Sequence, residues 1–462
     1  MARMRSISLA ALAVGALVGA LGLVGTSAAR PVRADATSVN HWNEVAVNTL
    51  AAIPGPNGGA PPALQINMGM VEGAVYDAVN AIGPRQHRPY LLKRRFGAMA
   101  SIDAAVATAA YDVLTDIVSN AEGPPFPGRE GLLTNLATEY AASLAAVDAG
   151  RFKAQGIDAG HAAAAAMLAA RVDDGRFGPS QWVPNSAPGH WQPLVNPTTG
   201  QPILDPTPWV GGVKPFLIQS SSQFRSVPPP ALDSAAYAEQ FNEVKSLGRT
   251  TGSTRTDDQT YFARWWQSAP TRSWNEVARQ LITRNDLDAA DAARLFAMQN
   301  LSAADASINC WSDKYHFDFW RPWNAIPRAE EDGNPGTTAE AGWTALITAP
   351  YPEWPSGHLC QDSAHVTFLR MFFGDVPLGG FQITSVSAFL TTEPKVRTFD
   401  TFSQPLAELI DARIWAGLHY RSADVAGQRL GERVAAYATA NYFQPVGKNV
   451  KHETSPPEAA ED

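Results

Sequence analysis

Apolar residues recur at helical spacing through the first half of the chain. A repeat of three or four positions gives a segment one apolar face and one polar face. The segments with this repeat are 68–83, 101–120, 129–147 and 155–174. No β-rich run separates them, so they predict a bundle of helices. Residues 35–60, which end in "PGPNGGAPP", are expected to be irregular.

The same periodicity returns in the second half of the chain. The helices predicted there are 234–248, 256–268, 274–285, 288–316, 355–374, 399–419 and 421–443. Residues 178–232 separate the two series and are rich in Pro, Gly and Trp, as a functional loop or linker often is. We therefore predict an all-α protein. Two helical bundles pack as one unit and are joined by a long Pro/Gly/Trp-rich connection.

The N-terminus has the pattern of a targeting segment. Arg3 and Arg5 precede an apolar run, 7–25, and a small-residue motif ends at Ala34. This is typical of a secretory signal peptide, although the run is also long enough for an uncleaved membrane anchor. We expect a secreted or periplasmic protein that is free of the membrane after cleavage. The expected divisions are a signal peptide 1–34, an N-terminal helical half with the wrapping connection 35–232, a C-terminal helical half 233–446 and a disordered tail 447–462.

Composition limits the partners. The 462 residues carry a net charge of −8, and 17% of them are charged. This balance argues against nucleic acid as a partner, so any anion site must be a local basic pocket. Cys310 and Cys360 would permit one disulfide after export, or they would be two buried thiols, and both readings stay open.

Three short segments carry the candidate chemistry. In "KYHFDFWRP", Lys314 and Arg321 are seven residues apart, so on a helix they point the same way. Cations buried together need an anion. In "PSGH", Ser356 and Gly357 would begin a helix and offer backbone N–H groups to an anion, with His358 at the edge.

The third segment is "ARIWAGLHYRSAD", which contains Arg413 and His419. Six residues apart on one unbroken helix they would face different ways, so a break near Gly417 is expected. Together the segments predict a pocket with three cations, a helix N-terminus and two histidines. Such a pocket suits a tetrahedral oxyanion. One histidine can bond to the central atom while the other moves protons.

These segments resemble the motifs of the vanadium-dependent haloperoxidases and of the phosphatidic-acid phosphatase type 2 superfamily. The shared pattern is K-x6-R-P, then P-S-G-H, then S-R-x5-H-x3-D. Other segments, such as "AVYDAVNAI", "PGHWQP" and "VPPPAL", are similar to bacterial haloperoxidase-like proteins, so the resemblance covers most of the mature chain. It differs at two positions. Ala412 stands in place of Ser, and Asp424 follows His419 by five residues rather than four, which leaves open what orients His419.

The resemblance implies a role for each motif residue. His419 would be the axial ligand of the metal, His358 the acid–base group, and Lys314 would also polarise peroxide. Trp311 would line the pocket, and Tyr351 occupies a position linked to halide preference, where it favours iodide or bromide over chloride. The residues that would hold the vanadate oxygens are Lys314, Arg321, Ser356, Gly357 and Arg413. The implied substrates are hydrogen peroxide and a halide. Helical bundles of this kind often pair, so a homodimer is also expected.

Two other functions use the same residues. In a soluble acid phosphatase, phosphate would occupy the pocket, His419 would become a phosphohistidine and His358 would protonate the leaving group. A non-catalytic oxyanion-binding protein would keep the cations but would not need His358 and His419. The exported chain, the bacterial haloperoxidase-like segments and the lack of a multi-span membrane pattern favour the haloperoxidase.

Ordinary structural roles compete for several residues. Lys314 could pair with Asp318 on a helix surface. His365, like His161 and His316, is expected to be structural. The three residues His358, Asp362 and His365 could suggest zinc, but the segment lacks a signature such as H-E-x-x-H.

Overall fold

The computed structural model describes residues 34–121, 126–180, 182–391 and 395–447. The signal peptide predicted at 1–34 lies outside these residues except for Ala34, and so does the predicted tail except for Gly447. Thirteen α-helices and one short antiparallel hairpin form the described part of the chain. The predicted all-α class is thus confirmed.

Four of the predicted N-terminal helices are present with shifted ends. They are α2 (Pro61–Asn80), α3 (Ile102–Ser119), α4 (Arg129–Ala145) and α5 (Arg151–Ala170). Helix α3 begins after Ser101, whose hydroxyl accepts from the Ala104 backbone N–H at 3.2 Å. Gly160 lets α5 approach α3 closely, because a Cβ there would lie 2.5 Å from the Thr108 Cβ.

The second series of helices is also present. It comprises α6 (Ala235–Leu247), α7 (Asp257–Trp265), α8 (Pro270–Arg284), α9 (Ala289–Phe317), α10 (Pro322–Ala325), α11 (Gly357–Phe373), α12 (Ser403–Trp415) and α13 (Arg421–Asn441). Three 3₁₀ turns, η1 (Gly55–Asn57), η2 (Pro208–Gly212) and η3 (Ile326–Glu331), lie between helices. Within the described residues, no helix combines the length and the apolar character needed to cross a bilayer.

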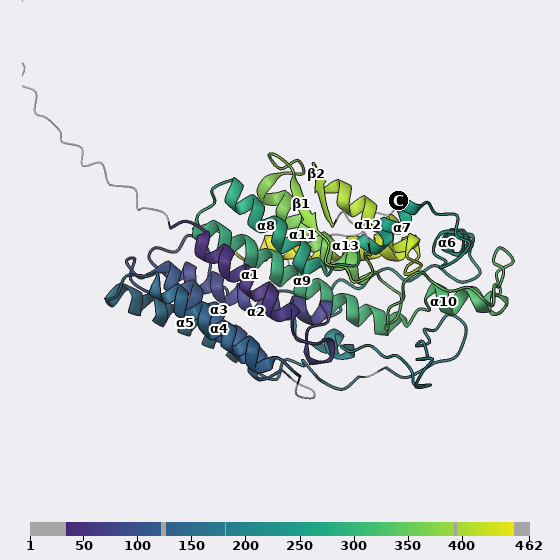
Figure 1. The fold of residues 1–462 in the computed structure, drawn as a ribbon, viewed down its shortest axis with the longest axis horizontal. Helices are drawn as coiled ribbons and strands as arrows, with labels where there is room; N and C mark the ends of the chain where they lie inside the picture. Colours follow the sequence, from purple (N-terminus) through teal and green to yellow (C-terminus); the bar gives the residue numbers. More distant parts are fainter. Residues whose placement is uncertain (1–33, 122–125, 181, 392–394, 448–462) are drawn as a thin grey trace, which may run out of the picture. The chain divides into compact units, whose positions relative to one another are not determined.

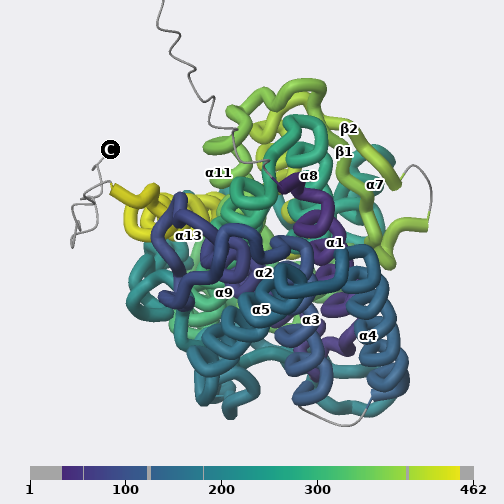
Figure 2. The backbone as a smooth tube through the Cα atoms, turned by 90° about the vertical axis from the view of Figure 1, so that its left-hand side faces the viewer, coloured from purple at the N-terminus to yellow at the C-terminus, as the bar shows by residue number. Residues whose placement is uncertain are grey.

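Helix α9 runs through the middle of the fold and joins the two series (Figure 1). It packs against α2 on one side and against α11 and α13 on the other. Figure 2 shows α3, α4 and α5 on the α2 side of α9 and α13 on the opposite side. One continuous apolar core, from Ala36 to Phe443, includes residues of both series, which therefore pack as one unit as predicted.

Helix α1, the one-turn helix α10 and a hairpin were not predicted from the sequence. Helix α1 (Thr37–Ala51) occupies a segment that was expected to be irregular. It buries Val39, Trp42, Ala46 and Leu50 at helical spacing, but the Pro/Gly-rich segment that follows obscured this pattern. A hairpin pairs β1 (Phe381–Thr384) with β2 (Val396–Phe399), and its strands are too short to show a clear alternation.

The Pro/Gly/Trp-rich connection is bound along one face of α9. Asp305, Asn309 and Asp313 follow one another at intervals of four residues, so their side chains lie in a row. Their oxygens accept at 2.7–2.9 Å from the backbone N–H groups of Phe216, Leu217, Ile218, Phe224 and Ser226. The connection therefore packs on the protein, and the Asp/Asn row on α9 (Asp305, Asn309 and Asp313) binds it.

Candidate oxyanion site

Lys314 is fully buried in the last turn of α9. Its Nζ donates to the backbone carbonyls of Pro352 (3.0 Å), Glu353 (3.0 Å) and Pro355 (2.6 Å). The pKa of Lys314 is lowered to about 8, mainly by burial and in part by the neighbouring Arg321 charge. The ammonium group thus ties α9 to the segment that precedes α11. It does not pair with Asp318, whose carboxylate instead accepts from Trp182 and contacts His190.

Arg321, the second predicted cation, is also fully buried. Its Nε donates to the Tyr351 carbonyl at 3.0 Å, and its Nη1 donates to the Leu418 carbonyl at 2.7 Å. The same Nη1 lies 3.2 Å from Nε2 of His419. Burial lowers the pKa of Arg321 to about 10, while the nearby Glu353 counteracts this shift. Arg321 therefore joins the first predicted segment to the third.

The "PSGH" segment begins a helix, as predicted. Ser356 is the N-cap of α11, and Gly357 is its first residue. A Cβ at Gly357 would lie 3.1 Å from the Trp311 ring, so any larger residue would crowd this ring. Ser356 Oγ and His358 Nε2 are buried and have no hydrogen-bond partner among the described residues. Both atoms are thus free to bind a ligand beside the helix N-terminus.

Arg413 and His419 are separated by the predicted break. Helix α12 ends at Trp415, and Gly417 has a φ of +75°, a left-handed conformation that glycine adopts at little cost. A Cβ at Gly417 would lie 2.5 Å from the Gly248 carbonyl oxygen, which again requires glycine. Arg413 Nη1 donates to Gln267 Oε1 at 2.9 Å.

The structure brings the predicted residues of the three segments together around the two histidines. Burial holds the pKa of His419 well below its usual range, and the positive charges of Arg321, Lys314 and Arg413 act in the same direction. Burial also lowers the pKa of His358, again with a contribution from Arg413, while the Ser268 backbone hydrogen-bonds to the ring and raises it. Both shifts favour the neutral imidazole, the form that a metal ligand or a proton acceptor must have.

Glu353 is the main site residue that sequence reasoning missed. Its fully buried Oε1 accepts from His419 Nδ1 at 2.9 Å and from the Tyr420 backbone N–H at 3.0 Å. Burial raises the pKa of Glu353 to about 7, while Arg321 and Lys314 lower it. Asp424 is buried near Ser356 and Arg413, and among the described residues it is Glu353, not Asp424, that bonds to the His419 ring. An acidic residue inside the otherwise apolar "YPEWP" was the available signal.

Trp311 and Tyr351 form an aromatic wall beside the cations. Their ring centroids are 5.1 Å apart, and Lys314 Nζ lies 5.3 Å from the centroid of the Tyr351 ring. Trp311 Nε1 donates to Asp205 Oδ2 at 2.9 Å, and the Tyr315 hydroxyl donates to the same oxygen at 2.8 Å. Asp205 belongs to the long connection, so this connection fixes the orientation of a pocket residue. The sequence reading did not identify Asp205.

Several residues outside the proposed oxyanion site bond to protein groups instead. His365 Nε2 hydrogen-bonds to Gln65 Oε1 at 2.9 Å, and Asp362 accepts from Trp274 Nε1 at 2.5 Å. His161 pairs with Asp112 at the surface of α5. The two cysteines, Cys310 and Cys360, are buried free thiols that contact each other.

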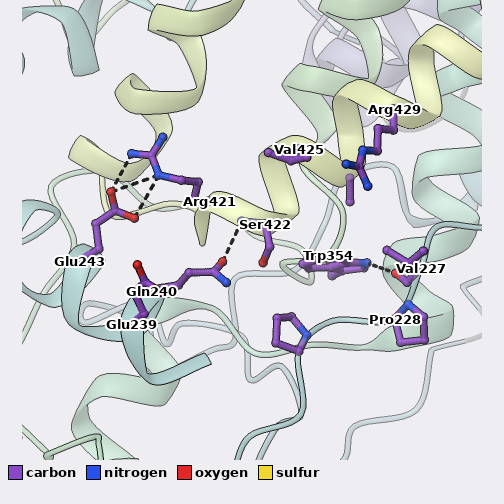
Figure 3. Close-up of a pocket in the computed structure, with 12 residues that line it drawn as sticks. Val227, Pro228, Glu239, Gln240, Glu243, Trp354, Arg421, Ser422, Val425 and Arg429 are labelled. Atoms are coloured by element: carbon purple, nitrogen blue, oxygen red, sulfur yellow. Dashed lines mark hydrogen bonds and ion pairs between the residues drawn. The ribbon is translucent and has the colours of Figure 1, made fainter. Parts of the chain in front are cut away.

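A surface cavity of about 690 Å³ lies beside the site. Trp354 forms part of its wall, with Nε1 directed at the Val227 carbonyl (3.0 Å), and Arg421 pairs with Glu243 nearby (Figure 3). None of the predicted anion-binding residues is among those that line this cavity. Adjacent residues of one segment therefore face opposite ways, since Glu353 contacts His419 and Trp354 contacts the cavity.

Comparisons with known proteins agree with the motifs. Residues 294–447 match the model of the VCPO second helical-bundle domain. The vanadium chloroperoxidase of Curvularia inaequalis is 23% identical over 200 residues, which cover 36% of this chain. The match spans 32%, about a third, of that relative's own length.

Solved structures show the same fold over most of the chain. A bacterial vanadium-dependent iodoperoxidase superposes with a TM-score of 0.69 at 21% identity, covering 91% of this chain and 99% of that one. A holo-type bacterial vanadium-dependent chloroperoxidase gives 0.67 at 18% identity, covering 88% and 98%. The resemblance to the vanadium-dependent haloperoxidases is thus confirmed by the family model over residues 294–447, and the two solved structures show a shared fold.

Proposed function

Because residues 294–447 match the model of the VCPO second helical-bundle domain, we propose that this protein is a vanadate-dependent haloperoxidase. It would use hydrogen peroxide to oxidise a halide. The observation that carries the proposal is the set of unused polar atoms. Ser356 Oγ, His358 Nε2 and the N-terminus of α11 meet beside three buried cations, and a tetrahedral oxyanion would satisfy them.

The residues present fit vanadate. The buried charges of Lys314, Arg321 and Arg413 would offset the charge of the oxyanion, while Ser356 Oγ and the Gly357 N–H would donate to its oxygens. His419 Nε2 would be the nitrogen that binds the metal, since Nδ1 is bonded to Glu353. Bound vanadate would supply Lewis-acid activation of hydrogen peroxide toward attack by the halide.

The chain's own groups have defined tasks around that centre. The neutral His358 offers Nε2 as a proton acceptor, and the Ser268 backbone holds its ring. Lys314 would exchange one carbonyl partner for the ligand, because all three of its N–H groups are bonded to the 352–355 segment. Its lowered pKa keeps it a ready proton donor near neutral pH.

Halide preference would be set at the aromatic wall. Tyr351 lies between the Lys314 and Arg321 charges, with ring distances of 5.3 Å to each. A large, polarisable halide that is weakly hydrated loses less hydration energy on entering this apolar wall. We therefore propose iodide or bromide as the substrate in preference to chloride. The fold shared with an iodoperoxidase is compatible with this preference.

Secretion, which would follow from the targeting pattern of residues 1–34, and a homodimer both stay predictions. Phosphate, which has the same shape as vanadate, is a possible occupant of the same donors. A soluble phosphatase is the second candidate, and the unprotonated Nε2 of His419 favours it equally, because a bare imidazole nitrogen is also the nucleophile of a phosphohistidine.

A paired assay tests the proposal. The protein is incubated with orthovanadate, the excess is removed, and hydrogen peroxide is added with iodide, bromide or chloride. In parallel, the vanadate-free protein is given a chromogenic phosphate ester. We expect halide oxidation that depends on vanadate, is lost in His419→Ala and is kept in the surface control His161→Ala. Phosphate release without halide oxidation would overturn the proposal and make His419 a nucleophile.

A further inference from the structure

His419 has a different kind of partner at each ring nitrogen. Nδ1 lies 2.9 Å from Glu353 Oε1, and Nε2 lies 3.2 Å from Arg321 Nη1. A guanidinium group can only donate, so Nε2 must be the acceptor and carries no proton. A neutral imidazole then has its proton on Nδ1, where the carboxylate oxygen accepts it. Both contacts thus select the same tautomer.

This assignment does not depend on the protonation of Glu353. Its Oε1 also accepts from the Tyr420 backbone N–H at 3.0 Å, and a peptide N–H can only donate. Oε1 is therefore an acceptor in either state of the carboxyl group, and any proton would be on Oε2. The residue that follows His419 thus holds the same oxygen that orients the His419 ring.

The backbone of Glu353 is held from several sides. Lys314 Nζ donates to its carbonyl and to those of Pro352 and Pro355. The next side chain, Trp354, is bonded through Nε1 to the Val227 carbonyl on the opposite side (Figure 3). The Ser356 N–H donates to the Ala423 carbonyl at 3.0 Å, so segments 353–356 and 420–423 are bonded side by side.

We propose that Glu353 is the positioning residue for His419, and that it fixes the tautomer whose unprotonated Nε2, hydrogen-bonded to Arg321 in this structure, would bind the oxyanion. This rests on the proposed function only in taking Nε2 as the atom that bonds to the ligand's central atom. Asp424, which the family pattern suggested for this task, is near Arg413 and Ser356 instead. Such outer partners of a metal-binding histidine typically change metal affinity by about 10- to 100-fold.

The first test is the tautomer itself. In protein with ¹⁵N-labelled histidine, the two ring nitrogens have different shifts when protonated or bare, and His419→Ala identifies the His419 signals. We expect the Nδ1–H tautomer in the wild type and in Glu353→Gln, whose amide oxygen can still accept. Glu353→Leu should give a mixture of tautomers, while Asp424→Asn should leave the tautomer unchanged.

The second test is ligand binding, measured by calorimetry without peroxide or halide. Glu353→Leu should lower the affinity for vanadate by about 10- to 100-fold. It should lower the affinity for phosphate much less, because bound phosphate forms no bond to imidazole. Glu353→Gln should recover most of the vanadate affinity. A general packing defect would instead lower the affinities for vanadate and phosphate equally in both variants, and this result would overturn the proposal.

The two proposals can fail separately. A His419 tautomer that is unchanged in folded Glu353→Leu, or one that changes in Asp424→Asn, overturns the role of Glu353 even if halide oxidation is observed. If the tautomer changes as expected but the protein does not oxidise halide, the positioning role of Glu353 is supported and the haloperoxidase function is overturned. If Glu353→Leu does not fold, Glu353→Met replaces it, with circular dichroism to verify its helical content.

Discussion

Helix α11 connects two buried polar regions that are built in opposite ways. Near its start, His358 belongs to the oxyanion site. Two turns later, His365 belongs to a group of neutral side chains that we call the amide cluster, formed by Gln65, Thr271, Asn275, Asn300 and His365. In the cluster, Gln65 Oε1 accepts from Thr271 at 2.6 Å and from His365 at 2.9 Å. Asn275 and Asn300 bond to each other through both amides, at 2.9–3.0 Å.

The oxyanion site lacks this internal balance. Lys314, Arg321 and Arg413 are all buried, and the charge of one lowers the pKa of another, as Arg413 does for Arg321. Ser356 Oγ and His358 Nε2 keep unused bonding capacity among the described residues. An unused polar atom alone does not separate the two regions, since His365 Nδ1 in the amide cluster also lacks a partner among the described residues. Only the oxyanion site combines such atoms with three buried charges of the same sign, and this combination indicates an anionic ligand.

The largest expected difference is catalytic and separates the two histidines of α11. His358→Ala should lower the rate of halide oxidation by about 100-fold or more, because it removes the proton acceptor. His365→Gln keeps a donor toward Gln65 Oε1 and should leave the rate nearly unchanged. Steady-state kinetics of both variants provide the measurement. Equal losses in the two would mean that His358 acts only through packing.

The amide cluster should dominate stability. Gln65→Leu removes the acceptor of Thr271 and His365 and the donor to Asn300. Each buried group left without a partner costs roughly 1–3 kcal/mol, so the unfolding free energy should fall by about 3 kcal/mol or more. Urea titration measures this loss. Phosphate affinity of the folded variant should match the wild type, and a large change would contradict the separation of the two regions.

An anion should stabilise the molecule through the oxyanion site. At a phosphate concentration 100 times its dissociation constant, binding adds about 2.7 kcal/mol to the unfolding free energy, which thermal scans would show as a rise in Tm. Arg413→Gln should reduce this rise, since it removes one of the buried cations. Gln65→Leu should start from a lower Tm and retain the full rise. A rise that is the same in Arg413→Gln would place the anion elsewhere.

The smallest effect, about 2 kcal/mol over the measured range of pH 4.5 to 6, is a pH dependence that belongs to the amide cluster. Burial lowers the pKa of His365 to about 3 from its ordinary 6.5. Between these values the unfolded chain binds a proton that the folded chain does not, so this residue makes stability rise with pH by about 1.4 kcal/mol per unit. The contribution is complete above pH 6.5 and is lost as the pH falls toward 3. His365→Gln should lack this slope between pH 4.5 and 6, and parallel wild-type and variant curves would rule out the assignment.

The sequence predicted the parts of the site that depend on short-range spacing. Lys314 and Arg321, the helix start at Ser356 and the break at Gly417 all follow from local rules, and the structure has each of them. Their individual roles toward a ligand stay predictions. Helix α1 also carried a readable periodicity, but its position next to a Pro/Gly-rich segment led to the wrong interpretation.

Glu353 and Asp205 could not be found in the same way. Each lies in a segment without periodicity, and each bonds to a partner that is far away in sequence. Glu353 and His419 are 66 residues apart, and Asp205 and Trp311 are 106 apart. Only the three-dimensional arrangement brings such pairs together. A sequence can show that a carboxylate in an apolar segment is unusual, but it does not show which residue that carboxylate orients.

The Asp/Asn row of α9 indicates when the long connection packs during folding. Asp305, Asn309 and Asp313 accept hydrogen bonds from backbone N–H groups that lie 85–89 residues earlier in the chain. Closing loops of this length costs entropy before any contact is gained, and the row exists only once α9 has formed. The connection should therefore dock late, on a finished helix. The Trp311 indole, already present on α9, should acquire its Asp205 partner, 106 residues earlier in the chain, in the same late step.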